Sequence, residues 1–267
     1  MGTDKRNRKK ENRRQKLDDL AKQQQRKRTR KLATRAAIFI AVIVGIALII
    51  SVSGGSDSSS TSDTTVATTA PVEGRAITGD TPCPATDGSE ARAATFEKAP
   101  SNCLEDGKTY TAVVTTNKGE FTIELDQNKA PLAANNFITL ARYKYFDNTQ
   151  CHRAIPDFVV QCGDPTATGS GGPGYSFADE LPQAGEYKLG SIAMANSGPN
   201  TNGSQFFIIT GDQGITLPPS YTLFGQVTNG LDTTVPALNA ASNPDPAANG
   251  VPTLEPLTIV SVVITES

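Results

Sequence analysis

The sequence predicts a mostly β domain, folded as a closed antiparallel barrel and preceded by one transmembrane helix. Two observations predict the barrel: short apolar segments recur along residues 109–267, and turn-forming residues separate them. A third observation, an uncharged apolar run over residues 36–52, predicts the transmembrane helix. The chain has 267 residues, which is enough for one substantial core with additional tails.

Residues 1–35 form a strongly basic segment. They carry 15 of the 25 lysines and arginines and four acidic residues, a net charge of +11, whereas the rest of the chain carries −13. Such opposed charges would attract each other in one compartment, so we expect something to separate them. We interpret this segment as a solvated cytoplasmic tail, with contact to anionic lipid headgroups as the second interpretation. Specific nucleic-acid binding is not expected, because the tail lacks interleaved aromatic residues.

Residues 36–52 contain no charged residue and separate these two halves. At a rise of about 1.5 Å per residue, a helix over these residues alone barely spans a hydrocarbon core of about 30 Å, and extending it over residues 32–34 and 53–55 completes the span. The basic flank predicts a single-pass membrane protein with a cytoplasmic N-terminus and an extracytoplasmic C-terminal part. A cleavable signal peptide is the alternative. Against it, the preceding region is long, and no Ala-x-Ala-like site follows the apolar run.

Two segments connect the predicted helix to the predicted barrel. Residues 53–72 are rich in serine and threonine and have almost no large apolar side chains, which predicts a flexible linker. Residues 73–108 are mixed in composition and contain Pro82, Pro84 and Pro100. We expect an irregular extension that lies against the following domain.

The chain has four cysteines, Cys83, Cys103, Cys151 and Cys162. An even number in an exported domain is typical of disulfides, and pairing neighbours in sequence would give Cys83–Cys103 and Cys151–Cys162. Spacing alone does not prove this pairing, and four buried free thiols are the alternative. A metal site is not expected, because the chain has no Cys-x-x-Cys motif and a single histidine.

The barrel domain begins with a hairpin signal. Residues 110–115 and 120–125 are apolar or alternating and flank Asn117-Lys118-Gly119, which is typical of a turn. Pro131 then stands where the first turn of a helix tolerates proline, and apolar residues follow it at helical spacing. Further strands are expected at residues 149–155, 158–162, 191–194, 206–209, 222–226 and 257–265, and a weak helix at 231–239.

Two segments carry the most informative motifs. One reads Cys-His-Arg-Ala-Ile-Pro-Asp-Phe-Val-Val-Gln over residues 151–161, and the other, over 193–207, joins two apolar strands by a loop of Asn, Gly, Pro and Ser. Together they closely resemble the cyclophilin family of peptidyl-prolyl cis/trans isomerases, notably its actinobacterial members, over residues 109–267. The resemblance implies an eight-stranded antiparallel barrel, capped by helices at Pro131 and near Leu231, with the binding groove on its outside.

The resemblance also implies a catalytic residue. An X–Pro bond has partial double-bond character and a barrier of about 18–20 kcal/mol, so a catalyst must bind the twisted amide better than either planar form. The prolyl nitrogen regains its lone pair in the twisted state, and a cationic donor aimed at it favours the twist. Arg153 occupies the place of the family's arginine that does this. No bond breaks, so no cofactor is expected.

Substrate contacts follow from the same resemblance. Its apolar pocket positions are Phe158, Val159, Phe207, Leu217 and Tyr221, and its polar strip is Gln161, Ala195, Asn196 and Gln205. Val159 stands where well-known members have methionine, and Tyr221 where many have histidine. The chain has no tryptophan, and Thr216 lies near the position of the tryptophan linked to tight cyclosporin binding. This departure puts cyclosporin binding in doubt.

We therefore expect a peptidyl-prolyl isomerase that assists the folding of exported, proline-containing polypeptides. The alternative is a proline-peptide-binding scaffold of the cell envelope in which catalysis is incidental. Arg153 favours the enzyme, because a protein that only binds peptides has no need of a donor at that position. His152, the only histidine, is expected to pack beside Arg153, since no Gly-x-Ser-x-Gly elbow accompanies it.

Overall fold

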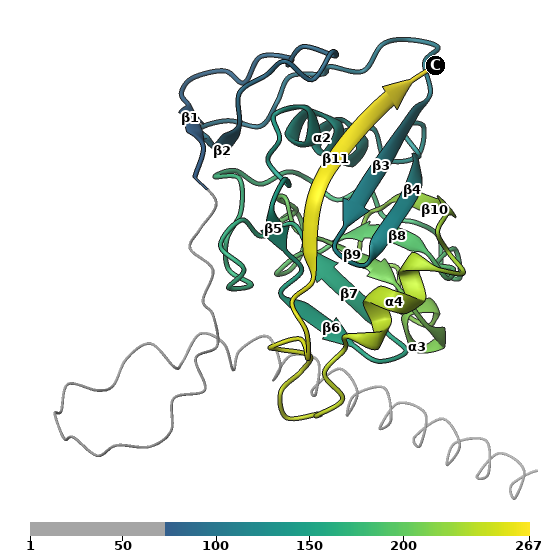
Figure 1. Cartoon of the computed structure of the whole chain (residues 1–267). Coiled ribbons are helices and arrows are strands. Elements are labelled where there is room, and N and C mark those ends of the chain that lie inside the picture. Colours follow the sequence, from purple (N-terminus) through teal and green to yellow (C-terminus); the bar gives the residue numbers. More distant parts are fainter. Residues whose placement is uncertain (1–72) are drawn as a thin grey trace, which may run out of the picture. The chain divides into compact units, whose positions relative to one another are not determined.

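The computed structural model describes residues 73–267, which form one large curled sheet, a smaller sheet and three helices (Figure 1). The strands are β1 (Arg75–Ile77), β2 (Ala93–Phe96), β3 (Tyr110–Thr116), β4 (Gly119–Leu125), β5 (Thr149–Gln150), β6 (Arg153–Ile155), β7 (Val159–Cys162), β8 (Ser191–Met194), β9 (Phe206–Ile209), β10 (Leu223–Asn229) and β11 (Thr258–Glu266). The helices are α2 (Pro131–Arg142), α3 (Asp212–Ile215) and α4 (Thr234–Ala240).

The large sheet has nine strands in the order β5-β11-β3-β4-β10-β8-β9-β7-β6, and all of its pairs are antiparallel. Its two end strands, β5 and β6, follow each other in the chain, separated by Cys151 and His152. The sheet therefore curls until its ends meet through the chain. The mostly β, antiparallel class is confirmed. Closure of the barrel by continuous strand pairing is not confirmed. The large sheet has nine strands instead of the eight expected.

The ninth strand arises because one expected strand divides in two. Residues 149–155 were expected to be continuous, but β5 pairs with β11 whereas β6 pairs with β7. The chain changes partner at Cys151, whose N–H donates to the Leu257 carbonyl at 2.8 Å. The other strands and the hairpin formed by β3 and β4 lie where the sequence predicts them, to within a few residues.

Helix α2 starts at Pro131, as the sequence predicts, although its N-cap residue Ala130 provides no side-chain cap. Instead the Glu180 carboxylate accepts hydrogen bonds from the N–H groups of Leu132 and Ala133, at 2.9 and 3.0 Å. A carboxylate at this end also complements the helix dipole. Helix α2 packs against β10 and β11, and α4, which is shorter than expected, against β4 and β7.

The inside of the curled sheet is filled by side chains. Phe137 of α2 lies with its ring centroid 4.9 Å from that of Phe146 and 5.4 Å from those of Phe206 and Phe224. All four rings are almost completely buried. Any binding surface of the domain must therefore lie on the outside of the sheet or in its loops.

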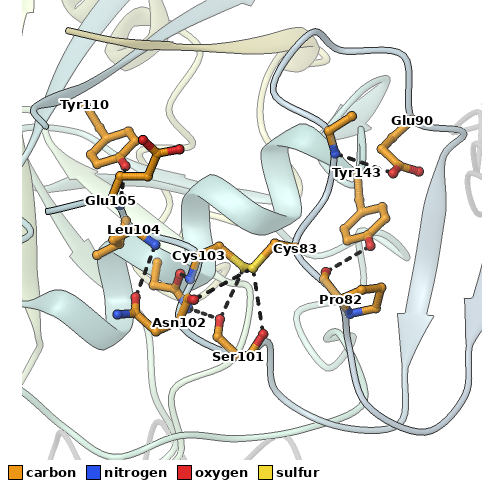
Figure 2. The surroundings of a disulfide bond; sticks show 12 residues. Pro82, Cys83, Glu90, Ser101, Asn102, Cys103, Leu104, Glu105, Tyr110 and Tyr143 are labelled. Carbon is orange, nitrogen blue, oxygen red and sulfur yellow. Dashed lines mark hydrogen bonds between the residues drawn. A yellow bond between two sulfur atoms is a disulfide. The ribbon is translucent and has the colours of Figure 1, made fainter.

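Residues 73–108 form an extension that is mostly without regular structure and contains the short strands β1 and β2. Strands β1 and β2 pair in parallel, and the Cys83–Cys103 disulfide joins the connection between these strands to the segment that follows β2 (Figure 2). Ile77, Ala93 and Phe96 are buried in the same core cluster as the barrel residues, so the extension packs against the domain. Figure 2 also shows the Tyr143 hydroxyl, just beyond α2, donating to the Pro82 carbonyl at 3.0 Å.

The expected basic tail (1–35), transmembrane helix (36–52) and linker (53–72) lie outside the described residues. Within residues 73–267, we find no helix with the length and apolar character that a membrane span requires.

Candidate active site

A second cluster of buried side chains lies apart from the main core. It consists of Val159, Tyr187, Ala193, Phe207, Ile209 and Leu217, with Phe158, Ala195, Ile215, Tyr221 and Leu223 packed against it. We call it the outer cluster. It arises from strand alternation, because Val160, Ile192, Phe206 and Ile208 point into the main core and their chain neighbours point the other way.

Strand register places polar and apolar groups of this outer face in one row. Arg153 of β6 lies opposite Gln161 of β7, which lies opposite Phe207 of β9. Phe207 in turn lies opposite Ala193 of β8, and Ala193 opposite Leu223 of β10. Residues that are directly opposite share a face of the sheet. A guanidinium, an amide and an aromatic ring thus stand side by side, although they come from three strands.

Three hydrogen bonds fix the Arg153 guanidinium. Its Nε and Nη2 donate to the carbonyl and the side-chain Oδ1 of Asn249, both at 3.1 Å, and its Nη1 donates to Gln161 Oε1 at 3.2 Å. A guanidinium has five N–H groups, so these bonds leave one on each terminal nitrogen. Burial lowers the pKa of Arg153 from its ordinary value, and the nearby Tyr221 phenol acts in the opposite direction. Arginine nevertheless stays charged at any physiological pH.

The glutamine that holds Arg153 is itself held. Gln161 Nε2 donates to Gln205 Oε1 at 2.8 Å, and Gln205 Nε2 donates to the carbonyls of Gly169 and Gly171 at 3.0 and 2.9 Å. The side-chain amides of Gln161 and Gln205 each accept a hydrogen bond through the oxygen and donate through the nitrogen. The orientation of both glutamines is therefore determined by Arg153 at one end and by the glycine-rich loop of residues 169–174 at the other.

A buried carboxylate shapes that loop. Asp164 accepts hydrogen bonds from the N–H groups of Gly169 and Gly171 at 2.6 and 3.0 Å, and from Thr166 N–H at 2.7 Å. Burial raises the pKa of Asp164, but the hydrogen bonds from Thr166 and Gly171 outweigh it and hold this pKa below its ordinary value of 3.8. These bonds fix the carbonyls of Gly169 and Gly171, which accept hydrogen bonds from Gln205 Nε2.

The apolar side of the site is made by rings at different angles. The ring of Phe207 meets that of Tyr221 edge to face, with centroids 5.3 Å apart. Val159 and Leu217 are buried beside them, and Phe158 is half-buried. These are the five positions that the sequence assigned to an apolar pocket, and the structure brings all of them into the outer cluster.

The loop after β8 carries the remaining predicted residues. Ala195 N–H donates to the Gln205 carbonyl at 2.9 Å, which holds the loop against β9. The Asn196 side chain donates to the Ser220 carbonyl at 2.9 Å and accepts from Gly198 N–H at 3.2 Å. Within residues 73–267 the main-chain N–H and C=O of Asn196 have no hydrogen-bond partner.

Comparison with known sequences decides the family. The family model described as cyclophilin type peptidyl-prolyl cis-trans isomerase/CLD matches residues 111–264, more than half of the chain. The chain belongs to the cyclophilin family. This match spans both motif segments and all the predicted catalytic and substrate-binding residues.

Several cyclophilins of known name are similar to this chain. Proteins named probable peptidyl-prolyl cis-trans isomerase B are 43% identical over 137 residues in Mycobacterium leprae and 40% identical over 164 residues in Mycobacterium tuberculosis. These alignments cover 46% and 56% of this chain, and 46% and 52% of the relatives, so the chain spans about half the length of those proteins. A peptidyl-prolyl cis-trans isomerase-like 1 from Gibberella zeae is 45% identical over 135 residues, which are 47% of this chain and 79% of that protein.

Solved structures agree with this assignment. A cyclophilin type peptidyl-prolyl cis-trans isomerase of Cryptosporidium parvum is 34% identical, with a TM-score of 0.53, and the match covers 59% of this chain and 98% of that one. A second structure of that protein, in the presence of the dipeptide Ala-Pro, gives a TM-score of 0.52 over 58% of this chain and 98% of that one. The fold of the described domain is therefore a cyclophilin fold.

Sequence reasoning missed several residues of this cyclophilin site. Asn249 holds Arg153 from a loop 96 positions further along the chain, and its only sequence signal is the turn-forming Asn-Gly pair at 249–250. Tyr187 donates its hydroxyl to the Tyr221 carbonyl at 2.6 Å, and burial raises the pKa of this phenol to about 12. A lone tyrosine in a loop gives no signal of such a contact.

The cyclophilin site shows no means of holding a metal. Within residues 73–267, no group of three or more His, Cys, Asp or Glu side chains is arranged to bind an ion. His152 is buried next to Arg153, and within the described chain its Nδ1 has no hydrogen-bond partner. Burial lowers its pKa, the Asp164 carboxylate raises it, and the Arg153 charge lowers it further, with a net result below the ordinary 6.5.

The Gln161→Leu variant is expected to lower kcat/KM for prolyl isomerisation about tenfold. It removes the acceptor of Arg153 Nη1, and a hydrogen bond to a charged group contributes about 1.5–3 kcal/mol. Tenfold corresponds to about 1.4 kcal/mol, at the low end, because Asn249 still holds the guanidinium. The matched control is Gln226→Leu, a strand glutamine that bonds Ser191 and Leu189 outside the site. Equal values of kcat/KM for both variants would contradict a role of Gln161 in orienting the Arg153 guanidinium.

His152 is expected to titrate below pH 6.5 in the folded protein. Because its folded pKa is lowered, the unfolded chain takes up the proton first, and the free energy of unfolding must fall as the pH drops through 6.5. His152 is the chain's only histidine, so one NMR titration of its ring resolves the effect. A midpoint at or above 6.5, or a stability that is unchanged between pH 7 and 5.5, would contradict it.

Proposed function

We propose that the domain catalyses cis/trans isomerisation of X–Pro bonds in polypeptides. The observation that carries the proposal is the Arg153 guanidinium, fixed by three hydrogen bonds beside the outer cluster, with one free N–H on each terminal nitrogen. The names of the relatives support it, as does the Ala-Pro dipeptide with which a similar cyclophilin was solved.

The proposed mechanism follows from the chemistry of the amide. The proline ring packs on the apolar side chains of Phe158, Phe207 and Leu217, and the chain preceding it runs along the open main chain of Asn196. As the amide twists, its nitrogen becomes pyramidal and basic. A free N–H of Arg153 donates to that nitrogen and stabilises the twisted state relative to both planar states.

No proton has to move in this mechanism. Arg153 stays cationic and keeps its role as a donor, and burial raises the pKa of the Tyr221 hydroxyl, so that it stays neutral. The outer cluster supplies a surface with little water, where a charge-assisted hydrogen bond is stronger than in solvent. The uncatalysed reaction takes about 10–100 s, which leaves a wide margin for a measurable acceleration.

A protease-free assay of the full-length protein in detergent tests this activity. The cis content of an Ala-Pro-containing peptide is displaced by a solvent jump, and its relaxation is followed with catalytic amounts of enzyme. We expect relaxation at least a hundredfold faster than the uncatalysed rate. Relaxation at the uncatalysed rate, with a protein whose disulfides are formed and whose circular dichroism is that of a β protein, would refute the proposal.

We further propose that the isomerase domain lies outside the cytoplasm, anchored by residues 36–52, and acts on exported, unfolded chains. The two disulfides support an oxidising compartment. The charge pattern around residues 36–52 supports a cytoplasmic basic tail, which is suited to contact anionic lipids. In cells whose plasma membrane is intact and accessible from the medium, added protease should digest the isomerase domain and leave the basic tail of residues 1–35 undigested. Protection of the domain would refute this topology.

A further inference from the structure

Strand β6 forms one end of the large sheet, and a loop rather than a strand covers its free edge. The Ala154 N–H donates to the Gly250 carbonyl, and the Asn243 N–H donates to the Ala154 carbonyl, both at 3.0 Å. Ala154 is the central residue of β6 and the neighbour of Arg153. Both ends of the loop of residues 243–250 are thus hydrogen-bonded to the strand that carries the Arg153 guanidinium.

The backbone of this loop is held in one conformation at the point of contact. Asn249 and Gly250 both have positive φ angles, +50° and +80°. A Cβ on Gly250 would lie 2.7 Å from the Ala154 carbonyl oxygen, so glycine is required there by space as well as by conformation. Asparagine is one of the few residues that tolerate the left-handed region. The pair therefore fixes both where Asn249 lies and how its side chain projects.

Asn249 takes up two of the five N–H groups of Arg153, on Nε and on Nη2. The two acceptors, one main-chain and one side-chain, belong to the same residue and approach the same edge of the planar guanidinium. A single acceptor would allow the plane to rotate about the bond, whereas two acceptors define the plane. Gln161 then occupies Nη1, on the other side.

We propose that Asn249 is a positioning residue for the isomerase reaction: it sets the plane of the Arg153 guanidinium, so that the two remaining N–H groups face the twisted amide. The inference rests on the proposed function, because it assigns how the catalytic donor is aimed. The rotational freedom that Asn249 removes from Arg153 in the free protein does not have to be removed in the transition state. Its effect therefore falls on kcat, while KM depends on the outer cluster.

The test compares two variants at the same position. Asn249→Gly keeps the main-chain acceptor and tolerates the positive φ but removes Oδ1, whereas Asn249→Asp keeps an acceptor on the same stem and also tolerates that φ. We expect Asn249→Gly to lower kcat about tenfold with KM within twofold of wild type. We expect Asn249→Asp to stay within threefold of wild type in kcat.

A matched control separates positioning from loop stability. Asn243 lies in the same loop, and its side chain bonds the Pro252 carbonyl and the Asp245 N–H without touching Arg153. Asn243→Gly should leave kcat unchanged, even if it lowers the free energy of unfolding as much as Asn249→Gly does. Equal losses of kcat in the two glycine variants would overturn the inference, since a loosened loop would then explain both.

NMR of the Arg153 Nε–H group provides a readout that does not depend on activity. In wild type we expect a distinct resonance with slow solvent exchange and hindered rotation of the guanidinium. In Asn249→Gly both processes should accelerate, and in Asn249→Asp they should return toward wild type. A wild-type protein that does not isomerise peptides overturns the proposed function together with this inference. An active wild type with kcat and guanidinium dynamics unchanged in Asn249→Gly overturns this inference alone.

Discussion

The Arg153→Ala variant is expected to lose about 100- to 1,000-fold in kcat/KM for X–Pro isomerisation. This range is the usual cost of removing one preorganised donor to a developing charge. Arg153 provides the two N–H groups that remain after Asn249 and Gln161 are satisfied. Stopped-flow or NMR assays of peptide isomerisation measure the loss.

Two further variants sharpen this prediction. Arg153→Lys keeps the charge but loses the planar fork, so it cannot bond Asn249 and Gln161 while donating to the amide, and we expect at least a tenfold loss. Arg75→Ala removes an arginine of the extension that pairs with Glu90, and its activity should equal that of wild type. An Arg153→Ala variant within threefold of wild type would exclude the guanidinium as the catalytic donor.

Removing the Cys151–Cys162 disulfide should lower both stability and activity. The bridge closes a short loop between cysteines that are 11 positions apart in the chain, and in the chain-entropy account it contributes about 3 kcal/mol to the free energy of unfolding. Cys151 lies two residues before Arg153, and Cys162 directly follows Gln161. The Cys151→Ala, Cys162→Ala double variant is therefore expected to loosen the wall that carries both side chains, with about a tenfold loss in kcat/KM.

The other disulfide provides the matched control. Cys83–Cys103 closes a loop between cysteines that are 20 positions apart in the chain, so its removal should also cost about 3 kcal/mol. It lies in the extension, which contributes no residue to the outer cluster, and its double alanine variant should retain wild-type kcat/KM below its melting temperature. Urea unfolding and peptide assays on both variants test the pair. Equal activity in the two would show that the Cys151–Cys162 bridge only stabilises the fold.

Local patterns predicted those parts of the fold that local chemistry determines. The turn at Asn117-Lys118-Gly119 gave the β3–β4 hairpin, and Pro131 gave the start of α2. The break between β5 and β6 could not be predicted in this way, because residues 149–155 read as one strand and only the partner strands reveal the change. The parallel pairing of β1 and β2 likewise depends on contacts between distant segments.

The same distinction holds for the site. The motif around Arg153 predicted this residue as the donor, and the strand alternation around Phe207 places that ring on the outer face. The partners of Arg153 divide by distance along the chain: Gln161 is eight positions away, on the next strand, whereas Asn249 is 96 positions away. No periodicity or spacing carries information over that distance, so the loop that fixes the guanidinium appeared only in the structure.

The most direct test of this account is the rate at which a bound X–Pro peptide interconverts on the protein. NMR exchange measurements at saturating peptide give this rate, and titration gives the dissociation constant, for wild type and Arg153→Ala. We predict that Arg153→Ala slows the interconversion at least a hundredfold while its dissociation constant stays within threefold of wild type. An unchanged interconversion rate on the variant would contradict the account, because the guanidinium would then have no role in stabilising the twisted amide.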